Sequence, residues 1–271
     1  MATVSLFGDR QHACAYLQYR PVPHEMVHTI MNYVKERMPF PLELAVDVGC
    51  GSGQGTVLLA PHFTRVVGTD ISPAQLENAR LNQQPPNVTY SLAPSDALPL
   101  DDESVDLVTA MSAAHWFHPE HFLEEVHRVL RPGGCVALFS YPIEMDVEYG
   151  DSSLTHLCQE FYSAVSAFRH PRIGTKSVDI YKKMFLSCPY QDKEWQDTLP
   201  ARRTLSVKAF IEMLKTFSTF QQMQLKDPEQ AKLICSNLKT KLLSSMQVCT
   251  TETKVTVTVK YFYWLACKPK Q

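Results

Sequence analysis

Four of the ten glycines in the chain fall within seven residues, at positions 49, 51, 53 and 55. The run follows the apolar stretch Leu44–Val48 and precedes a helical stretch that reaches about Ala60. Glycine this dense costs folding entropy, so the backbone here must pass very close to another group. The dinucleotide pattern G-x-G-x-x-G fits in no register, because Gln54, Thr56 or Leu58 stands at its last position. A phosphate-binding P-loop is excluded as well, because the chain has no Gly-Lys pair.

Strand-like and helix-like segments alternate on either side of this loop. Short strands are predicted at 44–48, 65–69, 88–93, 105–110 and 135–140, with helices up to about 60, at 72–81 and at 118–130. Strands separated by helices pair in parallel through right-handed crossovers, and such sheets bind ligands at the carboxyl ends of their strands. The spacing therefore predicts an open, doubly wound α/β sheet.

The flanking segments follow a different pattern. Before the sheet, residues 24–38 have apolar positions at helical spacing. After it, helices are predicted at 154–168, from Ser206 to about 217 and from Asp227 to 245, with strands at 190–198 and 253–266. We expect three parts: an N-terminal helical lid over 1–43, a cofactor-binding α/β core over 44–142, and cap helices over 143–271 whose last two strands complete the same sheet.

Composition narrows the function classes. The net charge is −2 and no Lys/Arg run occurs, which makes a nucleic-acid partner unlikely. No apolar run approaches the roughly 18 to 20 residues that span a bilayer, and no signal-peptide pattern follows Met1. The eight cysteines form no CxxC pair, so we expect reduced thiols and no metal site. We predict a cytoplasmic monomer or weak dimer that acts on a small-molecule substrate.

Three acidic residues stand where predicted strands end. Asp70 lies about 20 residues beyond the loop, where a carboxylate can accept both hydroxyls of a ribose. Asp47 belongs to the glycine motif itself, and a buried acid there needs backbone or ligand partners, which a cationic ligand would supply. Asp96 follows the third strand and could accept from an adenine amino group, or it is an ordinary turn residue.

At this point the sequence resembles a known family. The segments Asp47–Gly55, Val67–Ser72, Ser95–Pro99, His115–Phe117 and Val126–Gly134 are similar, in order, to the motifs of class I S-adenosylmethionine-dependent methyltransferases. Within that class the chain resembles the methyltransferase type 11 family and its small-molecule group, similar to trans-aconitate methyltransferases. The resemblance implies a mostly parallel, seven-stranded Rossmann-like sheet with a helical cap.

The resemblance also implies site residues. Asp47 with the backbone at Gly49 and Gly51 would hold the methionine part of S-adenosyl-L-methionine, and Asp70 would hold its ribose. The full set of cofactor residues implied is Asp47, Gly49, Gly51, Gly53, Asp70, Ile71, Asp96, Ala97, Ser112, Tyr19 and Arg20. Within this set, Ile71 packs on adenine, Asp96 with Ala97 reads its edge, and Tyr19 with Arg20 closes over the cofactor.

Ser112 and His115 would line the position of methyl transfer. Trp116 and Phe217 would form the wall of the substrate pocket. The family often has Asp after the His-Trp-Phe run, and His118 replaces it here, a change on the substrate side that leaves cofactor binding unaffected.

Transfer of a methyl group from a sulfonium is an in-line displacement in which the protein mainly supplies alignment. A carboxylate acceptor, which the family analogy suggests, needs no base, and arginines near the cap (Arg169, Arg172, Arg202, Arg203) could bind one. A hydroxyl, thiol or amine acceptor needs a base, and His115 is the candidate. The alternative for His115 is a packing role beside Trp116.

The sequence thus predicts a methyltransferase that acts on a small molecule. Two alternatives stay open: a non-catalytic cofactor-binding regulator, and a methyltransferase that acts on protein or RNA.

Overall fold

The computed structural model describes residues 18–19, 22–81, 84–171 and 177–270 of the 271. The strands are β1 Leu44–Val48, β2 Arg65–Asp70, β3 Val88–Leu92, β4 Val105–Met111, β5 Leu130–Ser140, β6 Asp146–Tyr149, β7 Ser152–Ser153, β8 Lys193–Ser206 and β9 Lys254–Cys267. The α-helices are α3 His24–Arg37, α4 Gln54–Leu59, α5 Pro73–Leu81, α6 Pro119–Val129, α7 Gln159–Ser166, α8 Ser177–Ser187, α9 Val207–Lys215, α10 Ser218–Lys226 and α11 Pro228–Ser245. Short 3-10 turns are η1 Ala60–His62, η2 Ala114–Trp116 and η3 Thr155–Cys158.

These strands form one sheet in the order β3-β2-β1-β4-β5-β9-β6-β7, with β8 paired to β9. The first five strands in this order are parallel, and β9 pairs antiparallel with β5, β6 and β8. The predicted α/β class and doubly wound sheet are confirmed. The sheet has nine strands among the described residues where we expected seven. The short β6 and β7 fall in the region that we expected to be helical cap.

Helices cover both faces of the parallel part of the sheet. Alternate residues of β5 point to opposite sides: Ala137 belongs to one apolar cluster with α3 and α4, and Leu138 belongs to another with α6 and α8. This alternation is the period-2 geometry of a strand buried on both faces. It explains why the strands read as continuous apolar runs.

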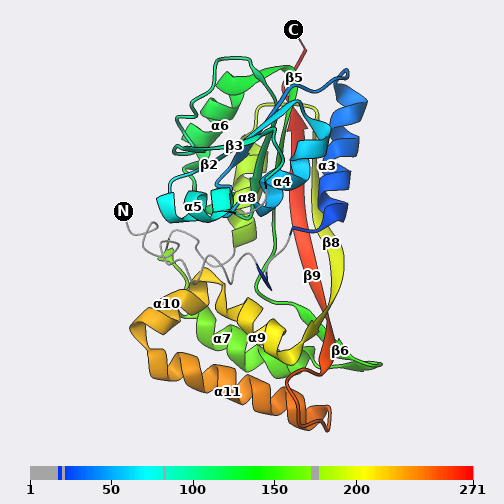
Figure 1. The fold of residues 1–271 in the computed structure, drawn as a ribbon, viewed down its shortest axis with the longest axis vertical. Coiled ribbons are helices and arrows are strands. Elements are labelled where there is room, and N and C mark those ends of the chain that lie inside the picture. Colours follow the sequence, from blue (N-terminus) through cyan, green and yellow to red (C-terminus); the bar gives the residue numbers. More distant parts are fainter. Residues whose placement is uncertain (1–17, 20–21, 82–83, 172–176, 271) are drawn as a thin grey trace.

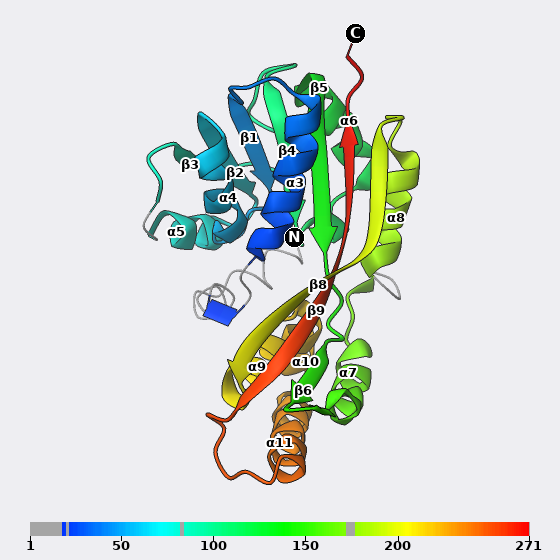
Figure 2. The ribbon, with the colours of Figure 1, turned by 90° about the vertical axis from the view of Figure 1, so that its right-hand side faces the viewer.

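A helical lobe lies below this sheet, made of α7, α9, α10 and α11 with β6, β7 and the adjoining ends of β8 and β9 (Figure 1). The two long strands β8 and β9 run side by side from the sheet into this lobe (Figure 2). Two helices of the lobe begin as predicted. Ser206 accepts from the backbone N–H of Ala209 at 3.1 Å, and Asp227 accepts from that of Gln230 at 3.0 Å.

An ion pair between a buried carboxylate and a partly exposed arginine fixes the start of the central strands. Asp106, fully buried on β4, accepts from the backbone N–H groups of Glu43 and Leu44 at 2.5 and 2.9 Å. Its other oxygen lies 2.5 Å from Nε of Arg131 on β5. One carboxylate therefore ties together the amino-terminal side of β1, β4 and β5.

Two cysteines form a covalent link that the sequence did not predict. Cys135 on β5 stands opposite Cys267 on β9, with Cα atoms 4.1 Å apart, and the two form a disulfide. Our expectation of reduced thiols was wrong for this pair, because the residues are 132 positions apart and only strand pairing brings them together. The other cysteines within the described ranges, Cys50, Cys158, Cys188, Cys235 and Cys249, are outside disulfides.

No helix in the described ranges combines the length and apolar character needed to cross a membrane.

Candidate active site

The glycine loop between β1 and α4 approaches its neighbours as closely as its composition suggested. Gly49, Gly51 and Gly53 all have positive φ angles, of 69°, 55° and 82°. A Cβ atom at Gly49 would lie 2.6 Å from Cβ of Ala113, and one at Gly53 would lie 2.1 Å from the hydroxyl oxygen of Tyr90. Both distances are too short for any larger residue. The loop therefore requires glycine for conformation and for space at the same positions.

Asp47, next to the end of β1, is only 1% exposed. Its two carboxylate oxygens accept hydrogen bonds from the hydroxyls of Thr56 and Thr109, at 2.7 and 2.9 Å. Burial raises the pKa of Asp47 to about 6, the two threonine hydroxyls lower it, and nearby Asp70 raises it further. At neutral pH the group is a poorly solvated anion with no cation paired to it among the described residues. A bound positive charge would compensate it.

The side-chain carboxylate of Asp70, at the end of β2, binds backbone N–H groups of the glycine loop and of its own turn. One oxygen accepts from the N–H of Gly51 at 2.9 Å and the other from that of Ser72 at 2.8 Å. Burial raises the pKa of Asp70, while these backbone donors lower it. The carboxylate thus connects the ends of two neighbouring parallel strands.

Asp47 and Asp70 line a cavity of about 1120 Å³. One end of the cavity lies along the carboxyl ends of β1, β2, β4 and β5, as expected for a doubly wound sheet. The other end reaches the helical lobe at Ser166, the last residue of α7, and at Phe217–Thr219, where α10 begins. This volume lies just above the range of ordinary ligand pockets, about 300 to 1,000 Å³. It can hold more than one small molecule.

Most of the residues implied by the resemblance line this one cavity: Asp47, Gly49, Gly51, Asp70, Ile71, Asp96, Ser112, His115, Trp116 and Phe217. Gly53 and Ala97 are not part of its lining. Tyr19 is not part of it either, and its backbone carbonyl accepts from Arg203 at 3.1 Å. Arg20 lies outside the described residues.

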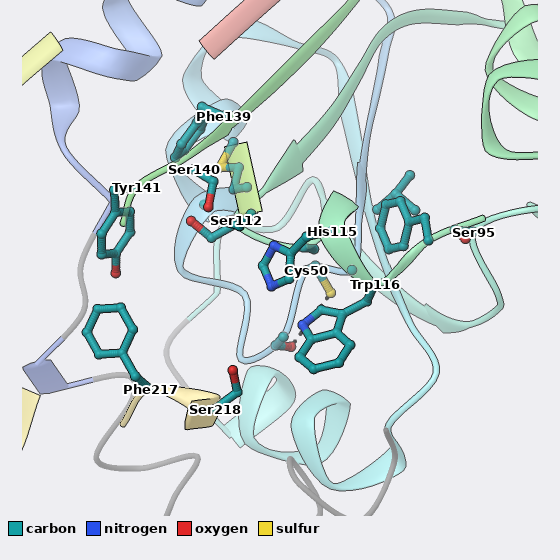
Figure 3. A pocket seen from close by; sticks show the side chains of 18 of the residues that line it. Cys50, Ser95, Ser112, His115, Trp116, Phe139, Ser140, Tyr141, Phe217 and Ser218 are labelled. Atoms are coloured by element: carbon teal, nitrogen blue, oxygen red, sulfur yellow. Dashed lines mark hydrogen bonds between the residues drawn. The ribbon is translucent and has the colours of Figure 1, made fainter. Parts of the chain in front are cut away.

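The loop after β4 carries the candidate base. Ser112 has a φ of 59°, a left-handed conformation that is uncommon for serine, and its N–H donates to the carbonyl of Phe139 at 2.8 Å. His115 follows in η2, and its ring faces the cavity (Figure 3). Nδ1 of His115 lies 3.5 Å from the hydroxyl of Tyr181, a fully buried residue of α8. A residue far away in sequence therefore contributes to orienting the imidazole.

Asp96 is exposed at the rim, and its carboxylate lies 4.0 Å from Nδ1 of His121. The ring of His121 stacks on that of His118, with centroids 4.1 Å apart. Both histidines line the cavity. His118, which replaces the family's Asp, thus stands at the edge of the candidate site.

Several lining residues were missed by the sequence analysis. Ser140 and Tyr141 follow β5, and the rule that ligands bind at the carboxyl ends of parallel strands could have identified them. Tyr261 on β9 comes from a strand with no motif, and no sequence signal marks it. Gln75 on α5 is 4% exposed, and its side-chain oxygen has no hydrogen-bond partner in the described part of the chain.

Comparison with known proteins finds similarity to methyltransferases. Residues 46–138 match the model of the methyltransferase domain. The chain is 36% identical to a putative methyltransferase of Dictyostelium discoideum over 143 residues, and this aligned region covers 52% of each protein. It is 31% identical over 150 residues to a probable S-adenosylmethionine-dependent methyltransferase of Saccharomyces cerevisiae, which covers 52% of this chain and 49% of the relative. The chain thus spans about half the length of the curated relatives that it matches.

One solved structure resembles nearly the whole chain. A putative type II methyltransferase from Anaeromyxobacter dehalogenans superposes with a TM-score of 0.70 at 25% identity, covering 92% of this chain and 98% of that one. The helical lobe is therefore part of the shared fold, along with the matched domain. These matches support a class I methyltransferase. The narrower resemblance to trans-aconitate methyltransferases stays a prediction.

Proposed function

We propose that this chain is an S-adenosylmethionine-dependent methyltransferase that acts on a small molecule. The observation that carries the proposal is the buried Asp47 beside the glycine loop, which no cation of the described residues pairs with. It lies inside the matched methyltransferase domain, at one end of a cavity with room for two ligands. The named activity of the yeast relative supports the choice of cofactor.

The residues at this end of the cavity fit S-adenosylmethionine. Its amino group would compensate the poorly solvated carboxylate of Asp47. The side-chain oxygen of Gln75, which has no partner among the described residues and would lie 3.8 Å from a Cβ at Gly51, can accept from a ligand beside the loop. Asp70 would hold the ribose, and the half-exposed side chain of Ile71 offers an apolar surface for a base. When bound, the cofactor supplies an electrophilic methyl group whose sulfur leaves with the bonding electron pair.

His115 is our candidate for the base. In the tautomer in which Nδ1 donates to the Tyr181 hydroxyl, Nε2 keeps its lone pair and can accept the proton of an acceptor hydroxyl, thiol or amine. Tyr181 would then be a positioning residue. A carboxylate acceptor would need no base, and Arg169, which lines the cavity, is the residue that would bind it.

Calorimetry tests the cofactor assignment directly. We expect S-adenosylmethionine and S-adenosylhomocysteine to bind, and NAD not to bind. Asp47→Ala and Asp70→Ala should each weaken binding, whereas Asp151→Ala, an exposed site outside the cavity, should not. Binding of NAD alone, or unchanged affinity in both cavity variants, would show that the glycine loop is not this cofactor's site.

A labelled-methyl assay on a metabolite extract separates an enzyme from a non-catalytic regulator. Label should appear in small molecules. Label in protein or RNA would point to a macromolecular substrate, and no label at all would favour the regulator. The cytoplasmic location and the monomeric or weakly dimeric state expected from the sequence stay predictions.

A further inference from the structure

Two serines stand together where β4 and β5 end. Met111 on β4 pairs in parallel register with Phe139 on β5, so the next residues, Ser112 and Ser140, leave the sheet beside each other. Both line the cavity, and Figure 3 draws their hydroxyls close together above the ring of His115. Neither hydroxyl has a hydrogen-bond partner in the part of the chain that the structure describes. The pair can therefore both donate to and accept from a ligand.

The cavity around this pair has an aromatic wall. The centroid of the Tyr141 ring lies 4.7 Å from that of Tyr261 and 5.9 Å from that of Phe217, and the Phe217 ring is packed edge-on. The rings of Phe139 and Tyr261 also pack edge-on, with centroids 6.0 Å apart. Aromatic side chains in such a wall prefer flat apolar ligands, which they contact by offset or edge-to-face packing. The serine pair is thus a small polar group at the edge of an apolar surface.

The charge of the lining disfavours an anion. Five carboxylates line the cavity within the described ranges: Asp47, Asp70, Asp96, Glu144 and Asp197. Among the described lining residues, only Arg169 and Lys260 are permanent cations, and Nζ of Lys260 is paired with Asp146 at 2.7 Å. With Asp47, Asp70 and Asp96 facing the cofactor, Glu144 and Asp197 are the carboxylates that an acceptor would meet among the described lining residues. A carboxylate acceptor would be repelled by both, with one described arginine to bind it. A neutral ligand has no such penalty.

From these three observations we propose that the acceptor is a neutral, ring-bearing hydroxyl compound, and that Ser112 and Ser140 select it by hydrogen bonds to its hydroxyl group. The inference rests on the proposed function. The serines are specificity-determining residues: they hold the oxygen beside His115, to which its proton passes, while the aromatic wall holds the ring. The oxygen forms the new bond to the methyl group as the methyl–sulfur bond of the cofactor breaks.

The test compares three sets of ring compounds that differ only in the group attached, a hydroxyl, a carboxylate or an amine, with 2-naphthol and 2-naphthoate as the reference pair. Methyl transfer is followed with labelled cofactor. Binding of the acceptor is measured separately by calorimetry with S-adenosylhomocysteine present. We expect label on hydroxyl compounds, and binding of 2-naphthol but not of 2-naphthoate.

The variants are Ser140→Ala and Ser112→Gly, the latter because glycine accepts the left-handed backbone at this position. Each should weaken 2-naphthol binding and raise KM by about 5-fold, the effect of one neutral hydrogen bond, with little change in kcat. Affinity for S-adenosylhomocysteine should not change in Ser140→Ala, and Ser163→Ala, on the exposed face of α7, should change nothing.

Label on carboxylates or amines alone, or on none of the three sets, would overturn the acceptor class while leaving the cofactor assignment standing if S-adenosylhomocysteine binds. Unchanged 2-naphthol affinity in both serine variants would overturn the role of the pair. Failure of S-adenosylhomocysteine to bind would overturn the proposed function and this inference with it.

Discussion

Replacing Asp47 by Asn should make the ligand-free protein more stable while weakening the cofactor site. The pKa of this carboxyl is about 6 in the folded chain, because burial raises it, against about 3.9 when unfolded. Below pH of about 4 the carboxyl is protonated in both states and costs nothing. As the pH rises above 4, the carboxyl ionises in the unfolded chain before it ionises in the folded one. The free energy of unfolding therefore falls by about 1.5 kcal/mol at pH 5 and by about 3 kcal/mol at pH 8.

Asparagine removes this cost and keeps the shape. The hydroxyl of Thr56 can donate to the amide oxygen, and that of Thr109, 3.5 Å from the carbonyl of Val46, can turn to donate there and accept from the amide nitrogen. The melting temperature of Asp47→Asn should therefore exceed that of the wild type by about 5–10 °C at pH 8, and by about half as much at pH 5.

Thermal unfolding followed by circular dichroism at the two pH values measures this, with Asp151→Asn, at an exposed site, as the matched control. Calorimetry with S-adenosylhomocysteine measures how much Asp47→Asn weakens binding at the cofactor site. A variant less stable than the wild type at pH 8, or a gain that does not depend on pH, would show that Asp47 is not an unpaired anion in the free protein.

Three further perturbations test the loop, the sheet and the base. Gly53→Ala should lower the free energy of unfolding in urea by 3 kcal/mol or more, roughly, because it adds a clash to backbone strain, whereas Gly150→Ala, with φ of 55° and nothing within 4 Å, should cost only about 1 kcal/mol. Arg131→Met should cost about 3 kcal/mol by leaving buried Asp106 unpaired, and a loss below 1 kcal/mol would mean that the ion pair adds little. His115→Asn should cut the rate on a hydroxyl acceptor by roughly 10², with cofactor affinity unchanged, and normal kinetics would assign His115 to packing.

The regular part of the fold was predictable because local signals and global structure agree there. The strand Leu44–Val48 matches β1 residue for residue, and the cap at Asp227 gives the start of α11. Predictions failed where long-range contacts decide. We expected residues 190–198 as a short polar edge strand, but β8 extends to Ser206, because twelve of its residues pair with β9. The helix α8 was missed although Val178, Tyr181 and Met184 recur in it at helical spacing. The separate α10 was missed as well.

The candidate site divides in the same way. Residues in the ordered motifs, such as Asp47 and Asp70, could be named from the sequence because the motifs follow predicted strands. Tyr181, which meets His115 from a helix 66 residues later, could not be named, because only the fold brings the two together. Ser140 lay within reach of the same topological rule that gave Ser112.

The disulfide gives the molecule a property beyond its fold. Cys135 and Cys267 join the strand before the helical lobe to the strand after it, so the whole lobe is part of a closed covalent ring. A protease that cuts once anywhere inside this ring leaves both fragments attached to one another. Such a nicked chain should run as a single species in denaturing electrophoresis until a reductant is added. A single cut in the backbone of the lobe therefore does not release a fragment from the molecule.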